Sequence, residues 1–196
     1  GIMGKTNALQ LVITLVGSEP PIWRRVIVSE SMKFADLHRV IQFSMGWCNS
    51  HLHQFEVADK RLSEFEEDIE TGATDSRQVG IRDLGLNRTG QVFSYLYDFG
   101  DSWQHEILVE DRMSVENKGQ LPLCVAGERA CPPEDSGGVH GYEIYLAVRE
   151  DPGHPMAEDW AGWLDPKFDP EDFDAHRVNR VFDREFGGFG RSPELG

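Results

Sequence analysis

The sequence is short of three things: cysteine, long apolar runs and basic residues. Its 196 residues include three cysteines, and this odd, small number predicts a reduced, cytoplasmic protein rather than a disulfide framework. The apolar stretch from Leu9 to Gly17 is broken by Gln10 and Thr14 and is too short to span a bilayer, so we expect no membrane association. Lys and Arg number 19 against 34 Asp and Glu. Without a basic stripe to neutralise phosphates, we expect no nucleic-acid partner.

The excess negative charge is unevenly distributed. The chain carries a formal charge of −15, and from residue 134 onward 15 acidic residues stand against six basic ones. A solvated acidic flank of this kind suits a basic partner. The acidic stretch 64–76, which begins at Glu64, has few apolar anchors and is expected to be a solvated loop or irregular helix.

The first half of the chain has the periodicity of strands around one helix. Ser31 is a plausible N-cap for a helix that carries an apolar stripe and stops near Gly46. The turn at Phe99-Gly100 joins two strands into a hairpin. Alternation of apolar and polar residues predicts strands over 8–16, 23–28, 51–57, 91–97 and 103–109.

The second half has a different character. Prolines and glycines between 114 and 138 predict a loop without long regular elements. Beyond it, apolar spacing predicts helices around 142–148, 156–164 and 173–186. We therefore expect one α+β domain over 1–196, with a strand-rich part at 8–112, a loop and helical annex at 113–186, and flexible ends. Its mixed or antiparallel sheet of about five strands would pack on the early helix in a β-grasp-like order.

Several motifs are similar to a known family. The chain resembles the plasmid pRiA ORF-three-like family over residues 9–181, nearly its whole length. The resemblance implies an α+β fold and a set of shared motifs, with no established activity; some members are labelled resolvase-like or repressor-like. The motifs that carry it are Trp23-Arg24-Arg25, Leu37-His38, Met45-Gly46-Trp47, His51-Leu52-His53, Tyr97-Asp98-Phe99-Gly100-Asp101, Trp103, His105, Cys124, Cys131-Pro132-Pro133-Glu134-Asp135, Gly137-Gly138, Gly141-Tyr142, Trp163, Phe168-Asp169-Pro170 and Asn179.

The sharpest polar cluster surrounds the predicted hairpin turn. Asp98 and Asp101 flank the turn, while Trp103 and His105 share one strand face. Two carboxylates and an imidazole can bind a divalent ion or divide acid and base roles. The alternative is structural, because Asp is favoured beside turns, where its side chain accepts backbone N–H bonds.

A second candidate lies in the loop that leads to the first annex helix. Two prolines stiffen the approach and two glycines permit unusual backbone angles. The segment can therefore present Glu134 and Asp135 rigidly toward a ligand, with Tyr142 at the start of the following helix. Alternatively, Asp135 or Ser136 only caps a turn before the following helix.

The third candidate is a metal site. Cys124 and Cys131 are six residues apart, wider than the usual spacing of zinc ligands. His51 and His53 point the same way on one strand, so these four residues can form a Cys2His2 zinc site. The alternative is that both thiols are buried and pack as small hydrophobes. His38, on the predicted helix, is expected at the surface.

These observations support three functional hypotheses. The first is a non-enzymatic binding or interaction module whose surface lies where the hairpin 98–105 meets the loop 131–142. The second is a divalent-metal-dependent hydrolase or nuclease-like enzyme that uses the carboxylates of both segments. The third is the resolvase-like or repressor-like DNA association that the family resemblance implies, and the acidic composition disfavours it. The cofactor is open, with zinc or another divalent metal as the candidate, and the protein or small-molecule partner is not identified by the sequence.

Overall fold

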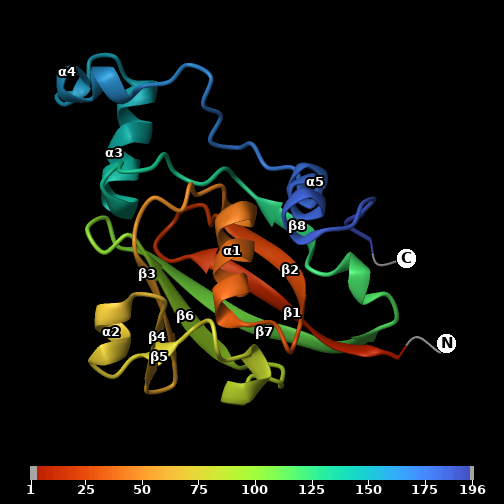
Figure 1. The fold of residues 1–196 in the computed structure, drawn as a ribbon. Coiled ribbons are helices and arrows are strands. Elements are labelled where there is room, and N and C mark those ends of the chain that lie inside the picture. Colours follow the sequence, from red (N-terminus) through yellow and green to blue (C-terminus); the bar gives the residue numbers. More distant parts are fainter. Residues whose placement is uncertain (1–3, 195–196) are drawn as a thin grey trace.

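The structure is a computed structural model and describes residues 4–194. One mixed sheet carries a helix across one face; the C-terminal helices, cyan to blue, are spread along the top of the view, and a short yellow helix lies at the lower left (Figure 1). Its eight strands lie in the order β5-β4-β3-β6-β7-β1-β2-β8, and only the β4–β5 pair is parallel. Their bounds are β1 Thr6–Leu15, β2 Trp23–Ser29, β3 His53–Val57, β4 Lys60–Ser63, β5 Thr74–Asp75, β6 Val92–Tyr97, β7 Trp103–Val115 and β8 Leu123–Glu128.

The helices fall into an early and a late group. The long helix α1, Phe34–Met45, follows the first hairpin and crosses the sheet (Figure 1). Short helical elements connect the strands, and two further long helices, of 13 and 12 residues, follow the loop. The remaining helices are α2 Glu66–Glu70, α3 Gly138–Glu150, α4 Ala157–Trp160 and α5 Ala175–Phe186, with 3-10 turns at Ile81–Leu84, Lys118–Gln120 and Ala161–Trp163.

The core forms between α1 and the inner face of the sheet. In β1 the residues at alternate positions from Leu9 to Leu15 are at most 1% exposed, as the period of a half-buried strand requires. Phe34 of α1 packs edge-on against Phe55 of β3, with ring centroids 5.2 Å apart. The same cluster extends to Tyr145 of α3 and Phe182 of α5, so sheet and annex share one hydrophobic core.

A buried arginine fastens α1 to the sheet. Arg24 of β2 is 2% exposed, and its guanidinium donates to the carbonyls of Ser44 and Met45 at the C-terminal end of α1, at 2.5 and 3.2 Å. It also donates to the carbonyl of Glu128 in β8, at 3.1 Å. The last carbonyls of a helix have no partner within the helix and carry partial negative charge, so Arg24 satisfies them without a carboxylate.

The α+β class is confirmed, but the expected number of strands was too low. The sheet has eight strands rather than about five. The additional ones are β4, β5 and β8, and β8 lies inside the stretch we expected to be loop. The third strand begins at His53, not at His51. β4 and β5 have only four and two residues, too few alternations to be recognised from periodicity, and β8 does not alternate between buried and exposed positions.

Two helix predictions also differ from the structure. The first helix begins at Phe34 after Lys33, whose side chain makes no capping hydrogen bond, whereas we expected Ser31 as the cap. Ser31 instead shares a hydrogen bond with Ser29. The helix predicted over 156–164 is a single turn, α4, continued by a 3-10 turn. Gly162 within this stretch favours the irregular end.

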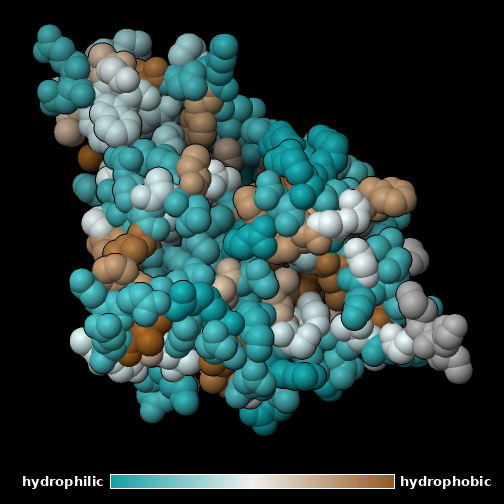
Figure 2. Space-filling view, in the orientation of Figure 1, coloured by the Kyte–Doolittle hydropathy of each residue, from teal (hydrophilic) through white to brown (hydrophobic). Residues whose placement is uncertain are grey.

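The visible surface is mainly hydrophilic. In Figure 2 apolar residues form small separate patches on a largely polar face. Among residues 4–194, no helix is long and apolar enough to cross a membrane.

The predicted flexible ends fall partly on residues 1–3 and 195–196, which lie outside the described residues. Nearer the core, Arg191 donates to Asp183 at 2.7 Å and to the carbonyl of Pro122 at 2.8 Å.

Candidate functional site

The hairpin turn and the loop before α3 meet in space. Asp98 has a positive φ of 63°, and its Oδ1 accepts the backbone N–H groups of Gly100 and Asp101 at 3.0 and 3.2 Å. Asp101 Oδ2 in turn accepts the N–H of Gly137 at 3.1 Å. Gly138 comes so close that a Cβ added there would lie 2.5 Å from the Asp101 carbonyl oxygen. The two segments that the sequence singled out are therefore neighbours, and a glycine is needed where they touch.

Glu134 is held in place from two sides. Its Oε1 accepts the backbone N–H of Cys48 at 2.7 Å and the hydroxyl of Tyr97 at 3.1 Å. The Tyr97 hydroxyl oxygen accepts the N–H of Ser50 at 2.9 Å, and burial raises the pKa of Tyr97 to about 12. Tyr97 therefore stays protonated and donates to the carboxylate. Glu134 links the loop to β6 and to the segment after α1.

His51 lies at the centre of the carboxylates. Its Nε2 is 2.7 Å from Asp135 Oδ1, 3.5 Å from Asp98 Oδ2 and 4.0 Å from Glu134 Oε2. The Asp98 side chain is 9% exposed and that of Asp135 is 57% exposed, so the group runs from the interior to the surface. Three carboxylates surround this single imidazole. We call His51, Asp98, Glu134 and Asp135 the junction site, and it keeps an excess of negative charge.

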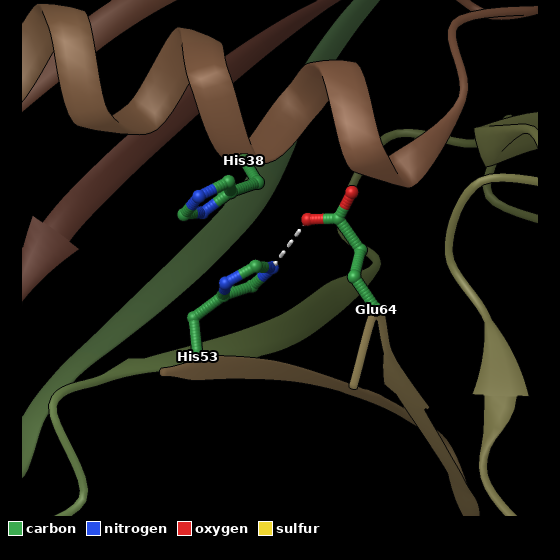
Figure 3. Close-up of side chains that lie close together, drawn as sticks. All are labelled: His38, His53 and Glu64. Carbon is green, nitrogen blue, oxygen red and sulfur yellow. Dashed lines mark ion pairs between the residues drawn. The ribbon is translucent and has the colours of Figure 1, made fainter. Parts of the chain in front are cut away.

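A second group of donors lies beside the junction site. His38 of α1, His53 of β3 and Glu64, just after β4, lie close together (Figure 3). The two imidazoles stack with ring centroids 3.4 Å apart and an interplanar angle of 5°. Glu64 Oε2 lies 3.4 Å from His53 Nε2. All three residues line a pocket of about 240 Å³, into which His51 also faces.

Burial sets the charge of this second group. It lowers the pKa of His53 to about 3 and that of His38 to about 4. It raises the pKa of Glu64 above its ordinary value. Both imidazoles are therefore neutral at pH 7, and each has one nitrogen lone pair to offer to a hydrogen-bond donor or to a metal ion.

A closed ring of hydrogen bonds orients His38. The Tyr95 hydroxyl lies 2.7 Å from His38 Nδ1, and His38 Nε2 lies 2.8 Å from Asn49 Oδ1. Gln42 Nε2 donates to the Tyr95 hydroxyl at 2.9 Å, and Gln42 Oε1 accepts the N–H of Asn49 at 2.7 Å. His53 differs, because its buried Nε2 has no hydrogen-bond partner among the described residues.

Sequence reasoning missed His38 and Glu64. His38 is 3% exposed, whereas we expected it at the surface. Its position offered a signal: it follows Phe34 by four residues and precedes Ile41 by three, which places it on the buried stripe of the helix. Glu64 gave no comparable signal, because its partners come from distant segments.

Trp103 and His105 lie in the core, away from the carboxylates. Both are 0% exposed. His105 Nδ1 lies 3.2 Å from the Tyr95 carbonyl, and Trp47 Nε1 donates to His105 Nε2 at 3.3 Å. Burial lowers the pKa of His105 to about 4. A neutral imidazole with both nitrogens engaged is part of the packing and does not reach Asp101.

Tyr142 and the cysteines are also separate from the junction site. Tyr142 is 4% exposed and packs against Phe168. Burial raises the pKa of Cys124 and of Cys131 to about 12, so both thiols stay protonated. Within residues 4–194, no group of converging metal-type donors includes a cysteine, and His51 and His53 belong to different groups. The four residues of the predicted Cys2His2 set therefore do not converge.

Comparisons with known proteins agree with this architecture. The family described as plasmid pRiA4b ORF-3-like protein matches residues 7–177. The uncharacterized protein y4hQ of Sinorhizobium fredii (strain NBRC 101917 / NGR234) is 35% identical over 158 residues, or 80% of each chain. The crystal structure of MM3350, a protein of unknown function from Methanosarcina mazei Go1, is similar with a TM-score of 0.76 and 35% identity. That match covers 87% of this chain and 97% of the other.

Proposed function

We propose that this chain, which belongs to the plasmid pRiA4b ORF-3-like protein family, is a non-enzymatic binding module. The family has no known function, and the relatives above are uncharacterised. The binding surface is the junction site, and its ligand is a positively charged group, such as a lysine or arginine side chain of a protein partner. The convergence of three carboxylates on one imidazole carries this proposal.

The junction site is already organised for a cation. One oxygen of Asp98 and one of Glu134 are fixed by backbone N–H groups, while the second oxygen of each faces His51. Asp135 reaches furthest into solvent, at 57% exposure. Carboxylates that are already oriented lose little side-chain freedom when a cation binds, which favours affinity.

The charge of the whole chain supports the same ligand class. A formal charge of −15 draws basic partners toward the molecule and speeds their encounter. The same negative charge disfavours DNA association, because it repels phosphate groups instead of neutralising them. A cytoplasmic location, expected from the cysteine content, stays a prediction.

The test is a titration with a fluorescein-labelled hexalysine peptide, followed by fluorescence anisotropy at about 0.15 M salt, where long-range attraction is screened. The double variant Glu134→Gln/Asp135→Asn removes two junction charges without changing side-chain size. We expect it to bind the peptide about tenfold more weakly, equivalent to about 1.4 kcal/mol.

The matched control is Glu158→Gln/Asp159→Asn. It removes the same number of charges from α4, where both residues are exposed. We expect it to change the affinity less than twofold. Equal weakening by both double variants would mean that only the total charge matters, and the junction site would lose its assigned role.

A second candidate function is a divalent-metal-dependent hydrolase. Donor atoms of His51, Asp98 and Asp135 lie within 4.8 Å of one another, and oxygen ligands with one imidazole suit Mn²⁺ or Mg²⁺. Saturable Mn²⁺ binding that His51→Gln abolishes, together with Mn²⁺-dependent cleavage of bis(p-nitrophenyl) phosphate, would favour the enzyme. Cleavage that persists in His51→Gln contradicts it.

A further inference from the structure

We propose that the pocket beside the junction site binds the guanidinium group of an arginine side chain of the basic partner. The inference rests on the proposed function for the charge of the partner, and it goes further by selecting arginine over lysine. The two acceptor atoms are Glu64 Oε2 and His53 Nε2, which lie 3.4 Å apart at a pocket of about 240 Å³ (Figure 3). We call Glu64, His53 and Phe65 the pocket site.

His53 provides an acceptor that no other described residue uses. Its side chain is 8% exposed, and its Nε2 is buried without a hydrogen-bond partner among residues 4–194. Burial lowers the pKa of this imidazole to about 3, so the ring is neutral at pH 7. In the tautomer with the proton on Nδ1, the lone pair of Nε2 accepts a hydrogen bond. Because buried polar atoms almost always have partners, an N–H donor in the pocket would satisfy this nitrogen.

Glu64 has no cation in direct contact with it. Within the described residues it forms no ion pair with Lys or Arg. Burial raises the pKa of Glu64, and the positive charge of Arg77 offsets this only in part. Arg77 is itself paired with Glu66 and Asp75, at 2.9 Å in each case. A part-buried carboxylate in this position gains from a cation that comes within hydrogen-bond distance.

The spacing of the two acceptors selects the kind of cation. A guanidinium group sends parallel N–H bonds from a planar, rigid fork, which suits acceptors as close together as Glu64 Oε2 and His53 Nε2, at 3.4 Å. The N–H bonds of an ammonium group diverge at the tetrahedral angle. At N···O distances of about 2.7–2.9 Å, two of its acceptors would lie roughly 4.4–4.7 Å apart. Arginine can therefore reach both acceptors at once, while lysine reaches one of them well.

The rim of the pocket suits the rest of an arginine side chain. Leu52 and Phe65 line it and are 47% and 40% exposed. A planar guanidinium stacks on an aromatic ring, and the methylene groups of the arginine stem can cover apolar surface. Two large apolar side chains beside a carboxylate and a free acceptor are complementary to a long cationic side chain with an apolar stem.

His38 holds the His53 ring in place without binding the ligand. Its two nitrogens lie 2.7 Å from the Tyr95 hydroxyl and 2.8 Å from Asn49 Oδ1, so neither is free. Its ring lies flat on that of His53, with centroids 3.4 Å apart and an interplanar angle of 5°. This stacking fixes the plane of the His53 ring, whose Nε2 lies beside Glu64 (Figure 3). An acceptor that is oriented before binding loses little freedom when the ligand arrives.

The pocket site and the junction site are adjacent. His51 belongs to the junction site through its contact with Asp135, and it also lines the pocket. A basic segment bound at the junction site therefore has the pocket next to it, and an arginine on that segment can enter. The two sites would bind different side chains of one partner.

The test compares fluorescein-labelled hexaarginine with hexalysine by fluorescence anisotropy at about 0.15 M salt. The quantity measured is the ratio of the two dissociation constants, which we call the arginine preference. We expect the unchanged full chain to bind hexaarginine about tenfold more tightly. Glu64→Gln removes the charge of one acceptor and keeps its size. It should reduce the preference to less than about threefold and change the hexalysine affinity less than about twofold.

A second variant tests the aromatic rim. Phe65→Leu keeps an apolar side chain but removes the ring on which a guanidinium stacks. We expect it to weaken hexaarginine binding by about two- to fivefold, the factor that corresponds to a cation–π contact at an exposed site. Its hexalysine affinity should change less, because the ammonium is not seated against the ring.

The controls separate the pocket site from total charge and from the junction site. Glu67 is exposed on α2 in the same acidic stretch, and Glu67→Gln should leave the arginine preference unchanged. The double variant Glu134→Gln/Asp135→Asn should weaken both peptides by a similar factor and also leave the preference unchanged. Circular dichroism of each variant establishes that it is folded, and the Glu64 side chain is one-third exposed, so Glu64→Gln does not disturb the core.

Three results would overturn the proposal. One is the absence of an arginine preference in the unchanged chain, or its persistence in folded Glu64→Gln. Another is an equal loss of preference in Glu67→Gln, since total charge would then explain it. The third is loss of preference in Glu134→Gln/Asp135→Asn, because the selection would then belong to the junction site. The hexalysine affinity tests the proposed function and the arginine preference tests the pocket site, so each can fail without the other.

Discussion

Asp101 and Gly137 are joined by a hydrogen bond of 3.1 Å, from the glycine N–H to the Asp101 carboxylate, although 36 residues separate them in the chain. This bond brings the β6–β7 turn against the loop before α3. The next residue, Gly138, approaches the Asp101 carbonyl closely. The junction site depends on this contact, because Asp98 comes from the turn while Glu134 and Asp135 come from the loop.

Gly138→Ala should destabilise the protein. Gly138 has a φ of 75°, and an added Cβ would meet the Asp101 carbonyl oxygen at 2.5 Å. Backbone strain alone costs roughly 1–3 kcal/mol, and the close contact adds to it, so we expect a loss of at least about 2 kcal/mol in urea unfolding. The control is Gly162→Ala, where φ is not in the positive range and no atom lies within 4 Å of the added Cβ. Equal stability of the two variants would contradict this account.

Arg24→Met should be much more damaging than Arg25→Met. The Arg24 guanidinium donates hydrogen bonds to carbonyls at the end of α1 and in β8. Loss of the guanidinium leaves several buried carbonyl acceptors without a donor. At about 1–3 kcal/mol for each such group, we expect a loss of more than about 3 kcal/mol. Arg25 pairs with Glu110 at 2.7 Å on a part-exposed surface, where an ion pair contributes about 0–1 kcal/mol. Urea unfolding of both variants measures the two losses in unfolding free energy. Losses of similar size would count against this prediction.

Asn179→Ala should loosen the attachment of α5 to the sheet. The Asn179 amide accepts the backbone N–H of Cys124 at 2.8 Å and donates to its carbonyl at 2.8 Å, so it pairs with the outer edge of β8. Its removal leaves two buried backbone groups without partners, and we expect a loss of about 2 kcal/mol. Arg180→Ala, at the exposed neighbouring position, should change the unfolding free energy by less than about 0.5 kcal/mol. A similar loss in both variants would assign the effect to helix propensity instead.

Long periodic elements could be predicted from the sequence. The strands β1, β2, β6 and β7 and the helix α1 all repeat their pattern over at least six residues, which is enough to separate a period of 2 from 3.6. The edge strands β5 and β8 gave no such pattern, because their pairing depends on neighbours that the sequence does not identify. The β-grasp-like order stays a prediction.

The residues of the candidate sites could likewise be predicted where a local sequence pattern marks them, and not where their position depends on distant segments. Asp98, Glu134 and Asp135 could be singled out because turn and glycine chemistry marks their segments. That His51 lies between them follows from pairing across the sheet, which periodicity does not reveal. His105 stood beside Asp101 in the sequence, yet strand alternation turns it into the core opposite Tyr95, where Trp47 and a carbonyl engage it.

Three buried histidines should make the fold less stable in acid. The pKa values of His38 and His105 are lowered to about 4 and that of His53 to about 3, below the value of about 6.5 in an unfolded chain. Between about pH 6.5 and 4 the unfolded chain therefore binds more protons at these positions than the folded chain. Their contribution to stability is complete above about pH 6.5 and is lost as the pH falls toward 4.

The measurement is the ¹⁵N shift of each imidazole ring followed by NMR from pH 8 to 5, together with urea unfolding over the same range. The rings of His38, His53 and His105 should keep the shifts of neutral imidazole at pH 5.5, while the unfolding free energy falls. Glu64→Gln provides a control for His53, because loss of a nearby carboxylate cannot raise the pKa of an imidazole. If any of the three rings protonates near pH 6.5 in the folded protein, burial does not hold it neutral, and its share of the acid sensitivity disappears.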